Sequence, residues 1–202
     1  MPTYEGIDIS RHQKTINWKL VSKNKNIQFI YMKASEGLRL KDPKYAYNLQ
    51  QAHKYGFKVG SYHYLSMGKP VKPQFHNFIA AMGHHTQDLK PMVDIEAFSR
   101  YPKRAVRDSL RKFVQLLRVH FRTSPVIYAS QKAYNRYLAI PEFNRLFLYI
   151  AKYTEGEPQI KGANYTLWQY TENGQIEGIP KRVDLVRFRE GRSIKNILLK
   201  RN

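Results

Sequence analysis

The chain contains no cysteine in its 202 residues. This absence excludes disulfide bonds, cysteine nucleophiles and thiolate metal sites. Long apolar runs are missing too, because the longest, such as residues 146–151, fall far short of the roughly 20 residues that cross a bilayer. The first residues have neither the basic segment nor the apolar segment of a secretory signal, so the sequence predicts no signal peptide in this chain.

Acidic residues are scarce, with 15 Asp and Glu against 35 Lys and Arg. The formal net charge of +20 predicts attraction to a polyanion: a nucleic acid, an anionic membrane surface or an anionic cell-wall polymer. Charge alone does not choose among these three. The length and a hydrophobic content of 42% are typical of one folded domain with a substantial core.

Short apolar runs, rich in β-branched and aromatic residues, alternate with helical patterns. Strands are predicted at residues 4–9, 27–34, 58–65, 91–96, 125–129, 146–151, 165–170 and 182–188. Helices are predicted at residues 42–55, 73–82 and 103–121, and helical patterns are poor after about residue 140. Such alternation implies a mostly parallel sheet. The predicted fold is therefore α/β, an irregular single-domain TIM-like barrel with few helices after the fifth strand.

Four acidic residues fall in or at the ends of predicted strands: Asp8, Asp94, Glu96 and Asp184. In a parallel barrel the carboxyl ends of the strands share one face, where active sites collect. Asp94 and Glu96 are two residues apart, so strand alternation puts both on one face, with backbone positions roughly 6.5–7 Å apart. Two carboxyls this close repel, and one should hold its proton tightly. The alternative is that this pair caps a loop or binds Lys and Arg.

Aromatic residues are the second signal, with 15 Tyr and two Trp. Tyr62, Tyr128 and Trp168 lie in predicted strands, and aromatic planes can pack against sugar rings. Filling of the core is the alternative for such residues. Lys33 also lies in a predicted strand, where it either pairs with a carboxylate of the acidic cluster or sits at a solvated strand end.

Other kinds of site have little support. The seven His lack the spacing of metal ligands, so no metal site is predicted. His63 is expected to occupy a satisfied buried position. There is no phosphate-binding glycine loop, no nucleophile elbow and no dinucleotide fingerprint in the sequence.

Several segments, in order along residues 4–188, resemble the glycoside hydrolase family 25 lysozymes, the Chalaropsis-type N-acetylmuramidases that include many phage endolysins. The matching segments are residues 6–13, 16–18, 29–37, 60–64, 91–96, 125–128, 150–153, 167–171, 178–179 and 183–185. One departure is Tyr149, which stands where the family often has Trp. The resemblance implies a catalytic domain over residues 1–190. Residues 191–202 form a basic tail, expected as a short packed helix or otherwise a frayed end.

The resemblance also implies roles for individual residues. Glu96 would be the general acid, and Asp94 would stabilise the sugar cation or orient the acetamido group of the substrate. Asp8 and Asp184 would complete the acidic floor of the site. Lys33, Tyr62, Tyr128 and Trp168 would line the sugar groove. No cofactor is implied.

The expected activity is hydrolysis of the β-1,4 bond between N-acetylmuramic acid and N-acetylglucosamine in peptidoglycan, outside the cytoplasm, by a monomer. Anionic wall polymers or lipid headgroups are possible partners of the basic surface, through Arg104, Arg107, Arg111, Arg118 and the tail; ordinary solubilising charge is the alternative. Nucleic acid is not expected as a partner. Two other functions stay open: a metal-dependent nuclease using Asp8, Asp94, Glu96 and Asp184, and a sugar-binding protein without catalysis.

Overall fold

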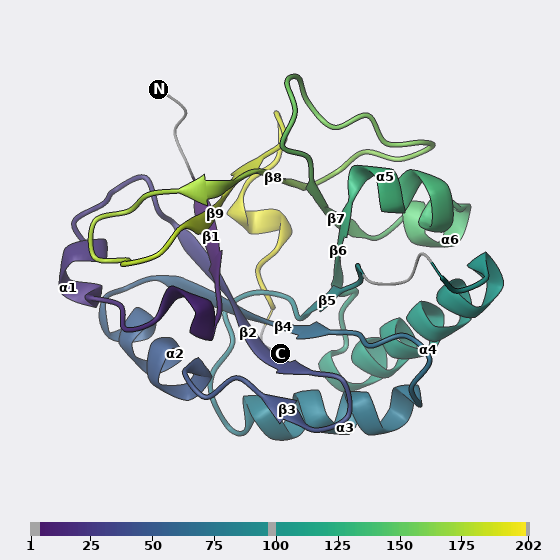
Figure 1. The fold of residues 1–202 in the computed structure, drawn as a ribbon, viewed down its shortest axis with the longest axis horizontal. Helices are drawn as coiled ribbons and strands as arrows, with labels where there is room; N and C mark the ends of the chain where they lie inside the picture. The colour runs from purple at the N-terminus through teal and green to yellow at the C-terminus, as the bar shows by residue number, and fades with distance from the viewer. Residues whose placement is uncertain (1–4, 97–99, 201–202) are drawn as a thin grey trace.

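The computed structural model describes residues 5–96 and 100–200 of the chain. In this part of the chain, eight strands close into a barrel, and a ninth short strand extends it at β2 (Figure 1). The barrel strands are β1 (Gly6–Ile9), β2 (Phe29–Glu36), β4 (Lys58–Tyr64), β5 (Met92–Asp94), β6 (Val126–Ser130), β7 (Phe147–Ala151), β8 (Leu167–Gly174) and β9 (Val183–Phe188). The predicted α/β barrel is confirmed, and each barrel strand overlaps a predicted one. The extra strand, β3 (Leu40–Lys41), was not predicted.

The last strand, β9, does not run parallel to the other strands of the barrel. Pairing from β1 through β2 and β4 to β8 is parallel, whereas β9 is antiparallel to both β8 and β1. A short turn region after β8 lets the chain return beside it, as antiparallel neighbours allow. The amino end of β9 therefore lies at the same face of the barrel as the carboxyl ends of the other strands.

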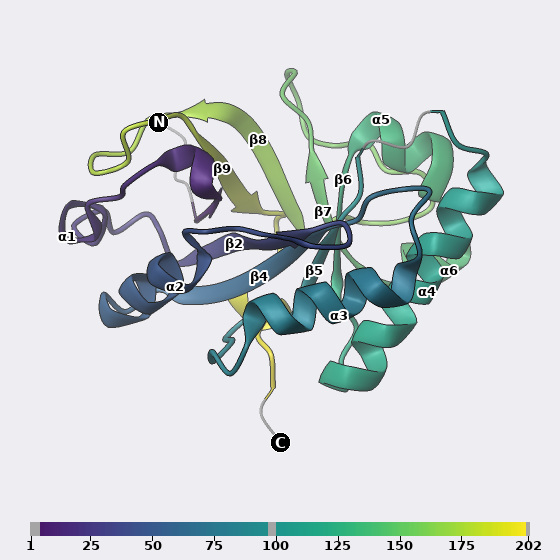
Figure 2. The same cartoon turned by 60° about the horizontal axis from the view of Figure 1, so that its bottom comes forward.

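The long helices pack outside the strands (Figure 2). They are α2 (Tyr45–Lys54), α3 (Val71–Met82) and α4 (Lys103–Phe121); the shorter ones are α1 (Trp18–Val21), α5 (Gln131–Ala133) and α6 (Pro141–Asn144), with single turns at Arg11–Gln13, Tyr134–Leu138 and Ile194–Asn196. The helix predicted over residues 103–121 has those bounds. After β7, the described chain contains no helix apart from the turn at Ile194–Asn196, as the weak helical patterns after residue 140 indicated. No helix in residues 5–96 or 100–200 is both long and apolar enough to cross a membrane.

Strand alternation divides the buried residues into two layers. Val93, Ile127 and Ile150 point outward and pack with the apolar stripe of α4, including Leu110 and Phe113. The inward layer fills the barrel and consists mainly of Phe29, Tyr31, Met92, Val126, Tyr149, Leu167 and Val186. The inward positions change from apolar to acidic toward the carboxyl ends of the strands, and this change creates a polar pocket above a packed interior.

The C-terminal segment closes the opposite end of the barrel. Ile197 is fully buried and belongs to the inner apolar layer. Leu198 forms an isolated bridge with Leu89, and the Leu199 amide donates a hydrogen bond to the Asp88 carbonyl at 2.7 Å. The single turn at Ile194–Asn196 is the helical part of the tail among its described residues. The last two residues of the predicted tail lie outside the described residues.

Candidate active site

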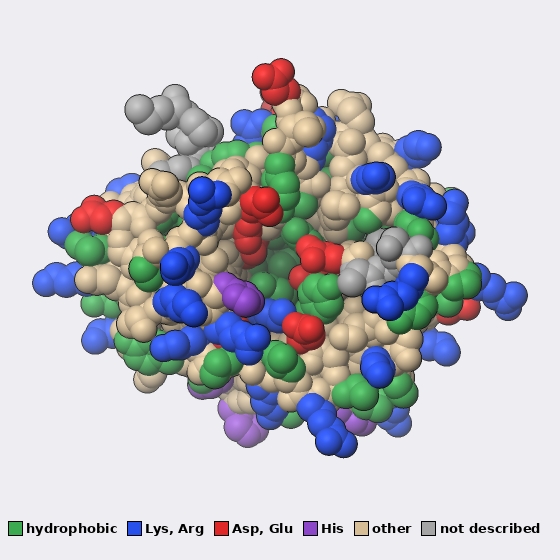
Figure 3. Space-filling model, viewed as in Figure 1, with side chains coloured by type: hydrophobic (Ala, Val, Ile, Leu, Met, Phe, Trp, Pro, Cys, Tyr) green, Lys and Arg blue, Asp and Glu red, His purple; other side chains and the backbone are tan. Residues whose placement is uncertain are grey.

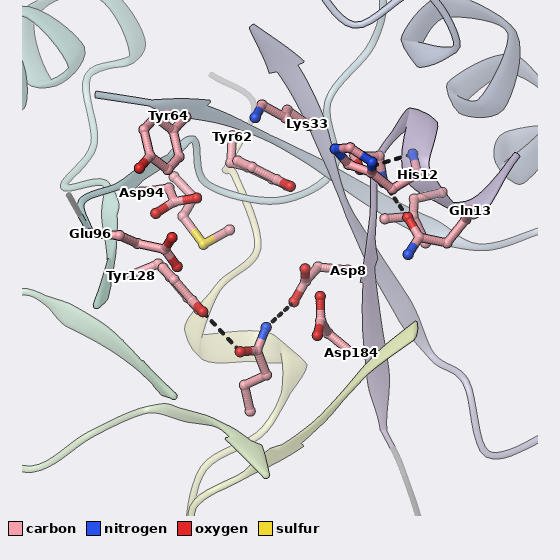
Figure 4. A pocket seen from close by; sticks show the side chains of 14 residues that line it. Asp8, His12, Gln13, Lys33, Tyr62, Tyr64, Asp94, Glu96, Tyr128 and Asp184 are labelled. Carbon is pink, nitrogen blue, oxygen red and sulfur yellow. Dashed lines mark hydrogen bonds between the residues drawn. The ribbon is translucent and has the colours of Figure 1, made fainter. Parts of the chain in front are cut away.

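A pocket of about 270 Å³ opens at the carboxyl ends of the parallel strands. The structure brings together there the four acidic residues that the sequence singled out, Asp8, Asp94, Glu96 and Asp184. Asp94 and Glu96 lie on one side of the pocket, and Asp8 and Asp184 on the other (Figure 4). On this face of the molecule, acidic side chains gather at the centre and basic side chains surround them (Figure 3).

Asp94 is the last residue of β5, and Glu96 follows it by two positions. Both side chains line the pocket, while Val93 and Ile95 are fully buried on the outer face. Asp94 is buried, and its Oδ1 has no hydrogen-bond partner among the described residues, whereas Glu96 is exposed at the pocket mouth. Burial, and then the charge of Glu96, raise the pKa of Asp94 well above its usual range. Partial desolvation by the pocket walls also raises the pKa of Glu96, and the neighbouring Tyr128 hydroxyl partly offsets this effect.

Asp8 and Asp184 face each other in register across β1 and β9. Asp8 Oδ2 accepts hydrogen bonds from the Tyr149 hydroxyl at 2.5 Å and from Gln169 Nε2 at 2.8 Å. Burial raises the pKa of Asp8; burial and the neighbouring Asp8 carboxyl raise the pKa of Asp184. Asp184 reaches this face from the start of an antiparallel strand, not from the carboxyl end of a parallel one. This corrects the expectation that the carboxyl ends of parallel strands gather all four acids.

Lys33 also lines the pocket, and its Nζ lies 2.7 Å from Oε2 of Glu36 and 5.0 Å from the ring centre of Tyr64. Residues three apart on a regular strand point to opposite faces. Here the register with β4 shifts between Lys33 and Ser35, so Lys33 and Glu36 come to the same face. The ion-pair partner is therefore Glu36, and not a carboxylate of the acidic cluster, which was one of the two alternatives that the sequence left open for Lys33. Lys33 still lowers the pKa of Glu96 through its charge.

The three predicted aromatic residues have different places. Tyr62 and Tyr128 line the pocket, and the Tyr128 hydroxyl donates to Gln169 Oε1 at 2.8 Å. Trp168 is not among the pocket residues, because it points to the outer face of β8, where Arg187 stacks 4.1 Å from its ring centre. Its Nε1 donates to the Lys152 carbonyl at 2.8 Å. The prediction that Trp168 lines the groove is thus corrected by strand alternation, which turns Gln169 inward and Trp168 outward.

The model of the glycosyl hydrolases family 25 matches residues 7–179, which include Asp8, Asp94 and Glu96. The chain belongs to this family. It is a glycoside hydrolase.

Relatives and solved structures agree with membership of family 25. The uncharacterized protein YegX of Escherichia coli O157:H7 is 30% identical over 186 residues, which are 90% of this chain and 68% of that protein. The autolytic lysozyme of Clostridium acetobutylicum is 30% identical over 187 residues, 93% of this chain and 56% of that protein. A solved family 25 glycosyl hydrolase from Bacillus anthracis superposes with a TM-score of 0.82 at 28% identity, covering 93% of this chain and 90% of that chain.

Sequence reasoning missed one residue at the centre of this family 25 pocket. Gln169 is buried and joins both sides of the pocket, because it donates to Asp8 and accepts from Tyr128 and, at 2.5 Å, from the Tyr153 hydroxyl. The sequence held a signal for this residue. Gln169 lies two positions after Leu167, so both point to the inward face of a predicted strand, and a buried polar residue at such a position needs hydrogen-bond partners. Tyr149 was noted as a departure from the family pattern, and its bond to Asp8 was not anticipated.

The histidines of the family 25 hydrolase do not form a metal centre in the described residues. No group of three or more His, Asp or Glu side chains in residues 5–96 and 100–200 is arranged to hold a metal ion. His63 is fully buried on the outer side of β4, with Nδ1 2.8 Å from Ser35 Oγ and its ring stacked 5.0 Å from Phe113. Burial lowers the pKa of His63 to about 4, so it stays neutral at physiological pH.

Proposed function

We propose that the protein is an N-acetylmuramidase that hydrolyses the β-1,4 bond between N-acetylmuramic acid and N-acetylglucosamine in peptidoglycan. The observation that carries this proposal is the position of Glu96, a carboxyl with a raised pKa at the mouth of a pocket that also holds buried Asp94. A protonated acid beside a second carboxyl is what glycosidic bond cleavage requires. The similarity to an autolytic lysozyme supports the choice of substrate.

In this proposal Glu96 donates its proton to the glycosidic oxygen while the bond from that oxygen to the sugar carbon breaks. The raised pKa favours the protonated form of Glu96 that this step requires, and exposure at the mouth lets the leaving sugar reach it. After the first product leaves, Glu96 in its ionised form can take a proton from the attacking water. The same residue therefore serves as acid and then as base.

Asp94 acts on the sugar that develops positive charge. Its buried Oδ1 lacks a protein partner among the described residues, so it is available to the N–H group of the substrate acetamido side chain. A hydrogen bond there would orient the acetamido oxygen toward the reacting carbon. Retention of configuration is the outcome that the family resemblance implies.

Other pocket residues assist Glu96 and Asp94, either through their charge or by contact with the sugar. Asp8 and Asp184 form the acidic floor, and the charge of Asp8 raises the pKa of Glu96. Lys33, Tyr62 and Tyr128 line the pocket and are proposed to bind the sugar. Trp168 is left out of the groove, since it packs on the outer face of β8. The substrate is peptidoglycan glycan strands, and the site of action is the cell wall, outside the cytoplasm.

Replacement of one carboxyl tests the proposal. Glu96→Gln keeps the size of the side chain and removes the acid, so lysis of purified cell walls should fall by about 10²–10⁴-fold or more. The circular dichroism spectrum and melting temperature should stay unchanged. The matched control is Glu190→Gln, which removes the same charge from an exposed residue outside the pocket and should leave lysis intact.

Product analysis separates this activity from the alternatives. Mass spectrometry of digested peptidoglycan should find new reducing ends on N-acetylmuramic acid, formed equally with and without a chelator. Near-normal lysis by Glu96→Gln would reject its role as the acid. Cleavage of nucleic acid that a chelator abolishes, without wall lysis, would favour the metal-dependent nuclease instead.

A further inference from the structure

A second cavity, of about 670 Å³, lies at the amino ends of β5, β6 and β7, on the side of the barrel opposite the acidic pocket. Lys90 precedes β5, Thr123 and Ser124 precede β6, and Phe147 begins β7. The C-terminal segment supplies the remaining wall, with Lys195, Asn196 and Lys200. Lys90 and Asp94 are four residues apart along β5 and its lead-in, roughly 13 Å of extended chain. The cavity is therefore separate from the active site.

Lys90 is the unusual residue of this cavity. It is 7% exposed, and its ammonium group donates to Thr123 Oγ1 at 3.2 Å and to the Leu198 carbonyl at 3.0 Å. It also lies 5.1 Å from the ring centre of Phe147. These partners are all neutral. A buried cation without an opposite charge is costly, and a side chain in this position normally has a paired carboxylate. Burial, together with the charge of Lys200, lowers the pKa of Lys90 accordingly.

The other charged groups around the cavity have the same sign. Arg122, Lys195 and Lys200 line it together with His120, and no Asp or Glu is found among its described lining residues. No ion pair within the described chain involves these cations. The cavity thus combines a concentrated positive potential with the hydroxyl groups of Thr123 and Ser124.

The basic stripe of α4, which the sequence suggested as an anion-binding surface, differs from the second cavity because acidic side chains pair with some of its cations. Arg111 makes a bidentate bond to Glu142, with a shortest distance of 2.9 Å, and a second bond of 2.6 Å to Asp108. Arg104 lies 3.8 Å from the same Asp108, and Arg107 donates to the Tyr137 carbonyl at 2.7 Å. Asp108 and Glu142 thus pair with two of the α4 cations, Arg104 and Arg111, whereas no carboxylate among the described residues pairs with the cations of the second cavity.

We propose that the cavity defined by Lys90, Arg122, Thr123, Lys195 and Lys200 binds a phosphate group, as a free phosphate or as a phosphate ester. A tetrahedral anion accepts hydrogen bonds from ammonium, guanidinium and hydroxyl donors approaching from several sides, and these donors surround the cavity. The volume exceeds that of one phosphate, which leaves room for the group esterified to it beside Phe121 and Phe147. Binding there would hold the enzyme to a phosphate-bearing surface with the acidic pocket facing away from it.

Titration of the full chain with inorganic phosphate tests the site, at ionic strength held constant with sodium chloride because surface charge effects are screened by salt. Binding is followed by calorimetry and by the amide resonances of Thr123 and Ser124. Lys195→Gln with Lys200→Gln, both exposed positions, should weaken phosphate binding at least tenfold and keep the fold. The matched control is Lys19→Gln with Lys23→Gln, which removes the same charge from exposed positions at α1 and should change affinity less than twofold.

A second arm identifies the source of the phosphate. Vesicles of phosphatidylglycerol and of phosphatidylcholine are compared by cosedimentation for the wild type and both double variants. Binding of phosphatidylglycerol that Lys195→Gln with Lys200→Gln abolishes would support the site and assign a lipid headgroup; binding of inorganic phosphate alone would support it and assign a soluble ester. Equal weakening by the two double variants, or no binding of inorganic phosphate by the wild type, would overturn the proposal. Lysis is not used as a readout, so the result is independent of the proposed activity.

Discussion

Asp8 on β1 lies directly opposite Asp184 on β9, and the two carboxyls meet where an antiparallel strand closes an otherwise parallel barrel. Burial raises the pKa of Asp8, and hydrogen bonds from Tyr149 and Gln169 oppose this effect. Burial and the Asp8 carboxyl raise the pKa of Asp184 to about 10, and the charge of Asp8 also raises the pKa of Glu96 in the same pocket. Several measurable properties depend on this arrangement.

Asp8→Asn should move the alkaline limb of the pH profile of wall lysis to lower pH. The charge of Asp8 raises the pKa of Glu96, so its removal lowers that pKa. Glu96 donates a proton in the proposed mechanism, and activity is lost as the pH rises through its pKa. Initial rates of lysis from about pH 4 to about pH 9 measure the limb. An unchanged alkaline limb would contradict the coupling between Asp8 and Glu96.

Lys33→Met should have the opposite effect. The Lys33 ammonium lowers the pKa of both Asp94 and Glu96, and methionine keeps the length of the side chain without its charge. The alkaline limb is expected at higher pH than in the wild type. In the double variant with Asp8→Asn, the two displacements should partly cancel. Displacement of the single variant to lower pH would show that Lys33 acts through contacts and not through its charge.

Asp184→Asn should stabilise the fold at neutral pH. Burial and the Asp8 carboxyl raise the pKa of Asp184 to about 10 in the folded protein, against about 3.9 when unfolded. Between these values the folded state binds the proton more tightly, so the free energy of unfolding falls as the pH rises. Asparagine needs no proton, and we expect a gain of about 1 kcal/mol or more, equal to about 2–4 °C in melting temperature.

Asp88→Asn is the matched control for this stability measurement. Burial raises the pKa of Asp88, but hydrogen bonds from the Val59 amide, His53 and Lys58 lower it by more, so the pKa lies below its usual value. Its contribution to stability is present at neutral pH and is lost as the pH falls through the lowered pKa. Differential scanning calorimetry should therefore find Asp88→Asn less stable than the wild type at pH 7, and Asp184→Asn more stable. The same sign for both variants would contradict the assigned pKa directions.

Gly60→Ala should destabilise the barrel by about 1–3 kcal/mol, the usual cost of overpacking a filled core. A Cβ atom at Gly60 would lie 2.5 Å from the Tyr31 ring and 2.8 Å from Leu89 Cβ. Both neighbours are buried inside the barrel, and the Tyr31 hydroxyl is held by the Lys90 carbonyl at 3.1 Å. Urea denaturation measures the loss. A variant as stable as the wild type would mean that Tyr31 can move despite this bond.

The sequence was sufficient where a local pattern had one structural solution. The apolar spacing of residues 103–121 specified α4 with its bounds, because one face of that helix is apolar and the other carries cations. The β-branched and aromatic runs specified the eight barrel strands in order. Alternation along β5 put Asp94 and Glu96 on one face and Val93 on the other. These results depend on contacts within one helix or strand, so the spacing of residue types along that segment is enough to predict them.

Tertiary structure decided what depends on how distant segments pair. The antiparallel direction of β9 brings Asp184 to Asp8, and the register shift beside Ala34 turns Lys33 toward Glu36. The closed barrel determines which face of β8 is inside. Gln169, which the sequence did not single out, therefore lies in the pocket, and Trp168 lies on the outer face. The cationic cavity around Lys90 likewise arises when the C-terminal segment packs against the amino ends of three strands. Residue order alone does not specify such pairings, since their energies come from burial and electrostatics between groups that meet after the chain has closed.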